Sequence, residues 1–224
     1  MGLIKSLAKL TVYGGAATTG GFFIWTRNSQ FVPFSTSDAI FQSAAYNKYN
    51  PEKNPTMHDL CVRRVPLSKI KPELQQPNGK LVEQFCAGVW SGKGYTIQRE
   101  ILARKYRGPE TAHQLWTPSD LKASTYPVGT QITDHFEVLE HTPESIVVRC
   151  GDSPRKTEVR PGDGLFEIGA KVLEKEGVAE FTLKSVFYQG LGKASGPPMP
   201  DYIVWLHKQY TKLWMETAIW NVTA

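Results

Sequence analysis

The chain has 224 residues, 41% hydrophobic and 21% charged, which suits a globular protein with one sizeable core and leaves no room for two large domains. Its formal net charge of +5 comes from scattered basic residues without a basic stripe, so we expect no nucleic-acid partner. Its cysteines, Cys61, Cys86 and Cys150, are far apart and odd in number, which argues against a disulfide framework or a zinc site.

The first element is an uncharged run over residues 10–26, which follows Lys5 and Lys9 and ends before Arg27. A helix of that length, at about 1.5 Å per residue, reaches the lower limit for crossing a bilayer core of about 30 Å. Three interpretations stay open, namely a membrane anchor, a secretory signal and a helix packed on the domain. We expect membrane association through a single N-terminal anchor, with a cytoplasmic location as the alternative.

Two short motifs match modification signals. Gly2 with Ser6 fits the N-myristoylation pattern, and Asn221 with Thr223 forms a glycosylation sequon. The first is a motif that occurs often by chance, and the second lies at the end of the expected closing helix. Neither is expected to be used.

The organisation beyond residues 1–27 has two parts, a connector over residues 28–57 and a folded domain over residues 58–224. The domain begins with an expected strand at 58–65. Residues 80–106 carry apolar side chains at helical intervals, interrupted by glycines, and predict two helices joined by a bend. That bend lacks the GxxxxGK[ST] spacing of a phosphate loop.

Four stretches that alternate apolar and polar residues follow, at 136–139, 146–150, 166–172 and 180–187. This period-two pattern predicts an antiparallel sheet with one buried side. A long amphipathic helix is expected from Asp201 to Asn221, with a buried face that combines aliphatic and polar residues: Ile203, Leu206, His207, Tyr210, Leu213, Trp214 and Thr217. Lys208, Lys212 and Glu216 are expected elsewhere on its circumference. The predicted fold is α+β, an antiparallel sheet wrapped on this helix, with a hydrophobic helix at the N-terminus.

A pocket between such a sheet and helix is typically apolar with a few placed polar groups. The expected lining comes from the closing helix and the last strand: His207, Tyr210, Trp214, Thr217, Ser185 and Gln189. His207 could act as an acid or base near neutral pH, and Tyr210 could donate a hydrogen bond to a carbonyl. The alternative is that His207 is a satisfied core histidine and Tyr210 a packing residue.

Two further positions deserve comparison with that set. Arg149 ends a strand before a long loop, where it could pair with Asp152 or bind an anionic group of a ligand. His135 shares a strand face with Glu137, opposite Phe136, and is therefore expected to face solvent. No hydrolase elbow, zinc helix, Walker loop or dinucleotide motif occurs in the sequence, so neither a metal nor a cofactor is expected.

Residues 128–138, with 145–149 and 190–192, resemble a START-like (SRPBCC, helix-grip) domain family of unknown function, a resemblance that covers mainly residues 128–222. The blocks FVPFSTSDAIF, NPTMHDLCVRRVPLSKI and GLGKASGPPMPDYIVWLHKQYTKLWMETA are similar to those of small fungal proteins linked to secondary-metabolite gene clusters, over nearly the whole chain. The resemblance implies a helix-grip fold with an apolar cavity, and it transfers no catalytic signature.

The residues and the resemblance together lead to one expected function and its alternative. We expect a cofactor-independent cyclase or isomerase acting on an apolar polyketide or terpenoid intermediate of fungal secondary metabolism. The alternative is a non-catalytic carrier of lipid-like ligands, and a third interpretation is a scaffold with a filled core. The expected partners are an apolar small molecule and, through residues 10–26, a membrane; the oligomeric state stays open.

Overall fold

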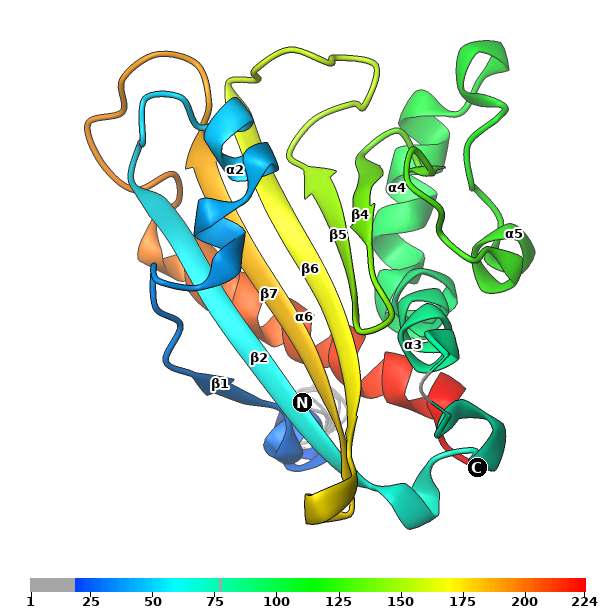
Figure 1. The fold of residues 1–224 in the computed structure, drawn as a ribbon. Helices are drawn as coiled ribbons and strands as arrows, with labels where there is room; N and C mark the ends of the chain where they lie inside the picture. The colour runs from blue at the N-terminus through cyan, green and yellow to red at the C-terminus, as the bar shows by residue number, and fades with distance from the viewer. Residues whose placement is uncertain (1–18, 77) are drawn as a thin grey trace, which may run out of the picture.

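A seven-stranded antiparallel sheet is the centre of the structure, a computed structural model that describes residues 19–76 and 78–224 (Figure 1). The strand order is β1-β2-β7-β6-β5-β4-β3, and every neighbouring pair is antiparallel. In chain order the strands are β1 (Gln30–Val32), β2 (Thr56–Pro66), β3 (Gln131–Ile132), β4 (Phe136–His141), β5 (Ser145–Cys150), β6 (Gly162–Leu173) and β7 (Val178–Gln189). The predicted sheet is confirmed, and the edge strands β1 and β3 are short additions to it.

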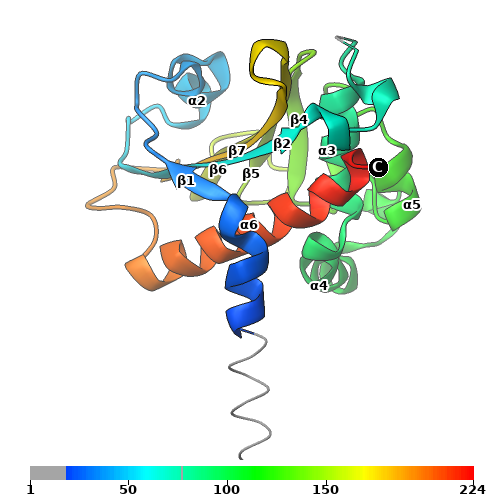
Figure 2. The ribbon, with the colours of Figure 1, turned by 90° about the horizontal axis from the view of Figure 1, so that it is seen from below.

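Helices lie on both sides of the sheet. They are α2 (Ala44–Tyr49), α3 (Lys80–Ser91), α4 (Thr96–Tyr106), α5 (Pro118–Ala123) and α6 (Asp201–Val222), and residues 19–25 are helical as well. Figure 2 shows α2 on one side of the sheet, with α4 and α6 on the other. The fold class is α+β with a long C-terminal helix, as predicted, and α6 contacts both the sheet and α3.

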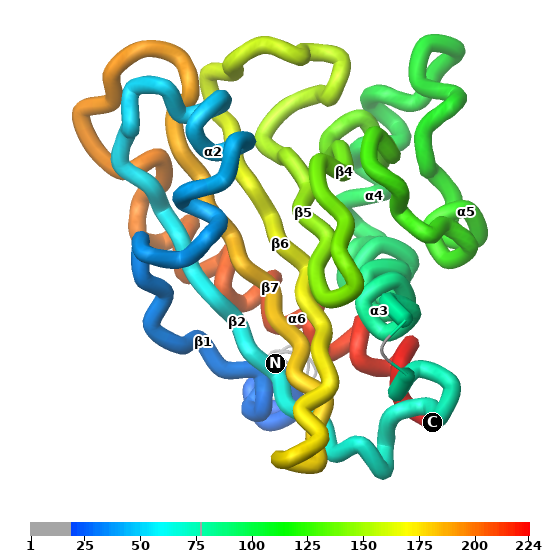
Figure 3. The backbone as a smooth tube through the Cα atoms, viewed as in Figure 1, coloured from blue at the N-terminus to red at the C-terminus, as the bar shows by residue number. Residues whose placement is uncertain are grey.

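The hairpin of β6 and β7 is buried on both faces, and its side chains contribute to two separate hydrophobic cores. Phe166, Ile168 and Leu183 point toward α3 and α6 and belong to the larger core. Leu165 and Val186 point the other way, into a smaller core under α2. The chain path in Figure 3 shows the long loop between β5 and β6 at the open end of this hairpin.

A close contact between α3 and α6 fixes the position of the C-terminal helix. A Cβ atom built on Gly88 would lie 2.7 Å from the carbonyl oxygen of Ala218, so only glycine allows this approach. Trp90 follows on α3, is fully buried, and meets the ring of Trp214 on α6 with centroids 5.3 Å apart. The predicted glycine-rich bend therefore serves as a helix-packing site, and the break between α3 and α4 comes at Gly92.

The buried face of α6 is rotated from the one predicted. Leu206, expected in the core, has 52% of its surface exposed. Glu216, expected outside, is buried, accepts a hydrogen bond from the Ser29 hydroxyl at 2.6 Å and pairs with Arg63 at 3.1 Å. The cause is tertiary: the chain around β1 lies over the second half of α6, which helical periodicity alone cannot reveal.

The predicted membrane segment, residues 10–26, lies mostly outside the described residues. The end that is described, residues 19–25, is helical and packs on α6 through Trp25, whose ring centroid is 5.4 Å from that of Trp220. Over residues 19–76 and 78–224, no helix has both the length and the apolar character needed to cross a membrane. Gly2 and its modification motif also fall outside the described residues.

Candidate functional site

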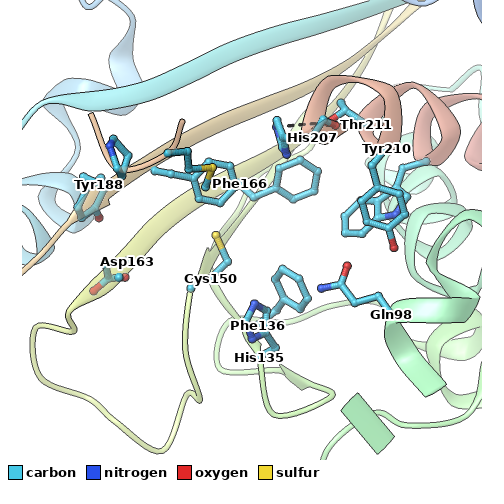
Figure 4. Close-up of a pocket in the computed structure, with 16 residues that line it drawn as sticks. Gln98, His135, Phe136, Cys150, Asp163, Phe166, Tyr188, His207, Tyr210 and Thr211 are labelled. Carbon is cyan, nitrogen blue, oxygen red and sulfur yellow. Dashed lines mark hydrogen bonds between the residues drawn. The ribbon is translucent and has the colours of Figure 1, made fainter. Parts of the chain in front are cut away.

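A cavity of about 350 Å³ lies between the first half of α6, α4 and the ends of β5, β6 and β7 (Figure 4). Its volume is at the lower end of the roughly 300–1,000 Å³ usual for small-molecule pockets. Its walls are mainly aromatic and aliphatic: Phe136, Phe166, Phe187, Met199 and Trp214. A void of this size counts against a filled-core scaffold.

Three of the residues predicted on α6 line this cavity. They are His207, Tyr210 and Trp214, joined by Thr211, which lies one turn after His207. Figure 4 shows His207 and Tyr210 across the cavity from His135 and Phe136, so polar groups face the space from both sides.

His207 faces a buried carboxylate on β2. Oδ2 of Asp59 lies 3.2 Å from Nε2 of His207, and Asp59 is only 5% exposed. Neither oxygen of Asp59 has a hydrogen bond among the described residues, so His207 faces it at ion-pair distance without hydrogen-bond geometry. A buried carboxylate is costly without a positive or hydrogen-bonding partner, so this contact ties the side chain of His207 to the sheet.

The surroundings of His207 fix which nitrogen holds a proton. The Thr211 hydroxyl donates to the backbone carbonyl of His207 at 3.0 Å and lies 3.3 Å from Nε2. Because the Thr211 hydroxyl already donates to that carbonyl, its oxygen accepts from Nε2, which assigns the proton to Nε2, the nitrogen that also lies 3.2 Å from the Asp59 carboxylate. Nδ1, without a hydrogen bond in the described part of the chain, keeps its lone pair. This is the carboxylate–imidazole arrangement that general bases use.

Tyr210 supplies a hydrogen-bond donor to the same space. Burial raises the pKa of Tyr210 to about 12, so its hydroxyl keeps its proton at neutral pH. Its ring packs edge-on against Trp214, with centroids 5.0 Å apart. The Tyr210 hydroxyl and the Trp214 indole nitrogen are both buried without a hydrogen-bond partner of good geometry among the described residues. Unpaired buried donors are uncommon, and a ligand carbonyl could accept from them.

His135 corrects a prediction, because it lines the cavity instead of facing open solvent. Thr133 and Asp134, just before it, adopt positive φ angles of 51° and 52° and form a tight turn. The strand begins only at Phe136, so strand alternation does not apply to His135. Burial lowers the pKa of His135, which keeps its imidazole neutral.

The opposite end of the cavity carries Cys150, Asp163 and Tyr188. Burial raises the pKa of the Cys150 thiol, so it is a protonated wall residue, not a nucleophile. Burial likewise raises the pKa of Tyr188, whose hydroxyl has no partner among the described residues. This end therefore offers a second donor, separate from Tyr210.

Arg149 lies behind this end and does not line the cavity. Its guanidinium pairs with Asp163 at 2.6 Å and donates to the carbonyl oxygens of Thr157 and Glu158. The ion pair that was considered as the structural alternative is therefore present, with Asp163 in place of Asp152. The side chain is 1% exposed and secures the long loop between β5 and β6.

The remaining predicted residues lie outside the cavity lining. Ser185 is fully buried on β7, directly opposite Asp59, and its hydroxyl has no partner among the described residues. Gln189 donates to the carbonyl of Leu191, at the surface. Thr217 accepts from the backbone N–H of Gly94 at 3.3 Å, which fastens the turn between α3 and α4 to α6.

Sequence reasoning missed Asp59, His135 and Gln98 as members of the site. Asp59 stands in a strand predicted from HDLCVRRV, and only the register with β7 turns it toward α6. Within residues 19–76 and 78–224, no cluster of three or more His, Cys, Asp or Glu side chains is arranged to hold a metal ion.

Comparisons of the chain with models of protein families, with curated proteins and with solved structures gave no match.

Proposed function

We propose that this protein is a cofactor-independent isomerase or cyclase that acts on a small, mainly apolar carbonyl compound. The observation that carries the proposal is the contact between Asp59 and His207 at the wall of an apolar cavity that also holds Tyr210. A base held by a carboxylate, beside a neutral donor, is the minimum equipment for moving a proton next to a carbonyl.

In the proposed reaction, Nδ1 of His207 removes a proton from the carbon beside the substrate carbonyl. The electron pair of that C–H bond moves toward the carbonyl oxygen, which accepts a hydrogen bond from Tyr210, and Asp59 stabilises the imidazolium that forms. Where a carbon–carbon double bond adjoins the deprotonated carbon, the enolate extends over it; His207 then returns the proton to the far carbon, the double bond shifts into conjugation with the carbonyl, and an isomer results. Alternatively, the enolate carbon attacks a second carbonyl and the proton ends on its oxygen, which closes a ring. Both outcomes conserve atoms and electrons without an external oxidant or reductant.

The substrate class follows from the walls and volume of the cavity. Aromatic walls such as Phe166 and Trp214 favour a compact unsaturated or cyclic molecule, and polyketide and terpenoid intermediates fit that description. The START-like, helix-grip relationship and the link to fungal secondary metabolism belong to this proposal as well. They are consistent with an α+β sheet that packs against a long C-terminal helix.

A carrier of lipid-like ligands is the second candidate. The predominantly apolar lining of the cavity favours it, because tight binding of an apolar molecule needs only such walls. The carrier does not need the Asp59–His207 contact, and this difference separates the two candidates.

Hydrogen–deuterium exchange tests the proposal without knowledge of the natural substrate. Purified protein is incubated in D₂O with a panel of apolar enones and 1,3-diketones, and deuterium beside the carbonyl is followed by NMR. We expect exchange faster than in buffer, reduced about 10²- to 10⁴-fold in His207→Ala and less in Tyr210→Phe. Binding of the same probes should persist in both variants.

Matched controls come from residues of the same type outside the cavity. His113 and Tyr202 are both exposed, so His113→Ala and Tyr202→Phe should exchange deuterium at the wild-type rate. If the probes bind but exchange no faster than in buffer, the enzyme hypothesis is wrong and the carrier hypothesis is favoured.

A further inference from the structure

The outer side of α6 carries an exposed apolar stripe that the cavity does not use. Tyr202, Trp205, Leu206 and Trp220 are each more than half exposed, at 67%, 55%, 52% and 55%. At about 100° per residue these positions fall within about 60° of Tyr202 around the helix axis, so they lie on one side of α6. Tyr202, Trp205 and Leu206 stand near its start and Trp220 near its end, and between them Glu216 is buried against Ser29 and Arg63. We call these four residues the α6 stripe.

The stripe and the cavity use different sides of α6. The cavity-lining residues of α6 are Tyr210, at about 80° from Tyr202, and His207, Thr211 and Trp214, between about 120° and 180°, at about 100° per residue. The same helix therefore serves two surfaces, one toward the ligand and one toward the outside. Exposed tryptophan and leucine side chains gathered on one side of a helix are a cost in water, which indicates a surface that is covered in use.

The helical residues 19–25 continue the apolar surface at one end of the stripe. Trp25 packs on Trp220, and the exposed Phe23 and Ile24 follow it toward the N-terminus. Figure 2 shows this helix pointing away from the sheet on the side where α6 lies. The α6 stripe and the entry of the apolar N-terminal sequence are thus on one side of the molecule.

Positive charge accompanies the stripe. Lys208 and Lys212 are partly exposed and lie along one flank of it, at about 240° and 280° from Tyr202. Arg27, at the end of helix 19–25, is exposed. The one acidic residue near the middle of this helix, Glu216, is buried and neutralised by Arg63. An aromatic and aliphatic line with lysines beside it complements an anionic lipid surface better than it complements another protein core.

We propose that the α6 stripe, with Phe23 and Ile24, docks this protein onto an anionic phospholipid bilayer. Tryptophan and tyrosine favour the headgroup region, where their rings are apolar and their polar atoms remain wet. Lys208 and Lys212 add electrostatic attraction to that interaction. The docking rests on α6 and helix 19–25 and does not depend on the reaction proposed for the cavity.

Site-specific fluorescence tests the docking in the full chain. Because Cys61, Cys86 and Cys150 are buried, a thiol-reactive environment-sensitive dye will label an introduced surface cysteine selectively. The test position is Leu206→Cys, and the control is Glu52→Cys, an exposed residue that follows α2 on the other side of the sheet.

We expect the dye at position 206 to shift to the blue on vesicles of phosphatidylcholine with phosphatidylserine, and the dye at position 52 to stay unchanged. Replacing Lys208 and Lys212 together by glutamine should weaken binding to these vesicles roughly 25-fold, since each basic residue near an anionic surface adds roughly fivefold. Lys48→Gln with Lys175→Gln, far from the stripe, is the charge-matched control and should change little.

Three results would overturn the docking. The protein could bind vesicles while the dye at 206 stays water-exposed, which would assign membrane contact to other residues. It could fail to bind anionic vesicles at all. The dye at 206 could also shift without lipid as protein concentration rises, which would assign the α6 stripe to contact with a second copy of the chain.

Discussion

Asp59 and His207 meet where β2 passes under α6, with Oδ2 of the aspartate 3.2 Å from Nε2 of the histidine. The carboxylate is buried, and the imidazole lies at the wall of the cavity. Asp59 of β2 therefore orients the imidazole of His207, which α6 carries. The sequence also allowed His207 to be a core histidine with both ring nitrogens hydrogen-bonded. In the structure Nδ1 has no hydrogen bond among the described residues, and the ring lines an apolar cavity.

Asp59→Asn tests whether this contact orients a base. Asparagine keeps the shape of the side chain but loses the charge that stabilises an imidazolium, so deuterium exchange of a bound ketone should fall about 10²- to 10⁴-fold. Binding of the ketone should change little. Nitrogen NMR of His207 should show a proton on Nε2 in the wild type and a mixed tautomer in the variant. Asp201→Asn, at the exposed start of α6, is the control. Wild-type exchange in Asp59→Asn would reduce Asp59 to a packing role.

His135 should make the free energy of unfolding of the protein depend on pH. Burial lowers its pKa below the ordinary value of 6.5, so between these two values the unfolded chain binds the proton more readily than the folded chain. The free energy of unfolding should therefore fall as pH drops from about 7 toward the lowered pKa and then level off. His135→Leu should flatten this slope in denaturant titrations at each pH. His113→Leu, at an exposed site, should keep the wild-type slope.

The positions of the long elements were predictable from the sequence because their periodicity is strong. β6, β7 and α6 each contain enough alternating or helical repeats to identify them without a structure. The orientation of α6 was not predictable, because Glu216 is buried against Ser29, just before β1, and Arg63 of β2. Periodicity reports which side chains are apolar, and Leu206 is apolar yet exposed.

Only the residues that α6 contributes to the candidate site could be predicted from the sequence. His207, Tyr210 and Trp214 could be selected because a single helix presents them together. Asp59 could not, because its link to His207 depends on the pairing of β2 with β7, far away in the sequence. His135 was missed for a local reason, the two positive φ angles that precede it.

The buried pair of Arg149 and Asp163 should be a major stabilising contact. Arg149→Met leaves the Asp163 carboxylate buried without its counter-charge and frees the loop that Arg149 holds, so a loss of about 3–5 kcal/mol in the free energy of unfolding is expected. Asp163→Leu in addition should cost less than the two single changes summed, as measured by a double-mutant cycle in urea. Glu176→Gln breaks only the exposed pair with Arg64 and should have little effect. Additive losses would show that the two buried charges do not interact.

The close approach of α3 to α6 predicts an unusual result for Gly88→Ala. Alanine is the better helix former by about 1 kcal/mol, so helix propensity alone favours the variant. Its Cβ, however, would lie 2.7 Å from the Ala218 carbonyl oxygen and 3.0 Å from the Ala218 Cα, which are backbone atoms that cannot turn aside. We expect a net loss of about 1–3 kcal/mol in urea denaturation. Gly108→Ala, where no atom lies within 4 Å of the new Cβ, should lose far less.

A second substitution separates this backbone clash from ordinary crowding of side chains. Ala218→Gly removes a side-chain methyl group but leaves both backbone atoms that the new Cβ would meet, so the Gly88→Ala, Ala218→Gly double variant should be no more stable than Gly88→Ala alone. Because α6 also carries Trp214, an aromatic wall of the cavity, its displacement should weaken binding of ketone probes in parallel with the loss of stability. Recovery of stability in the double variant would contradict the close backbone packing of α3 on α6.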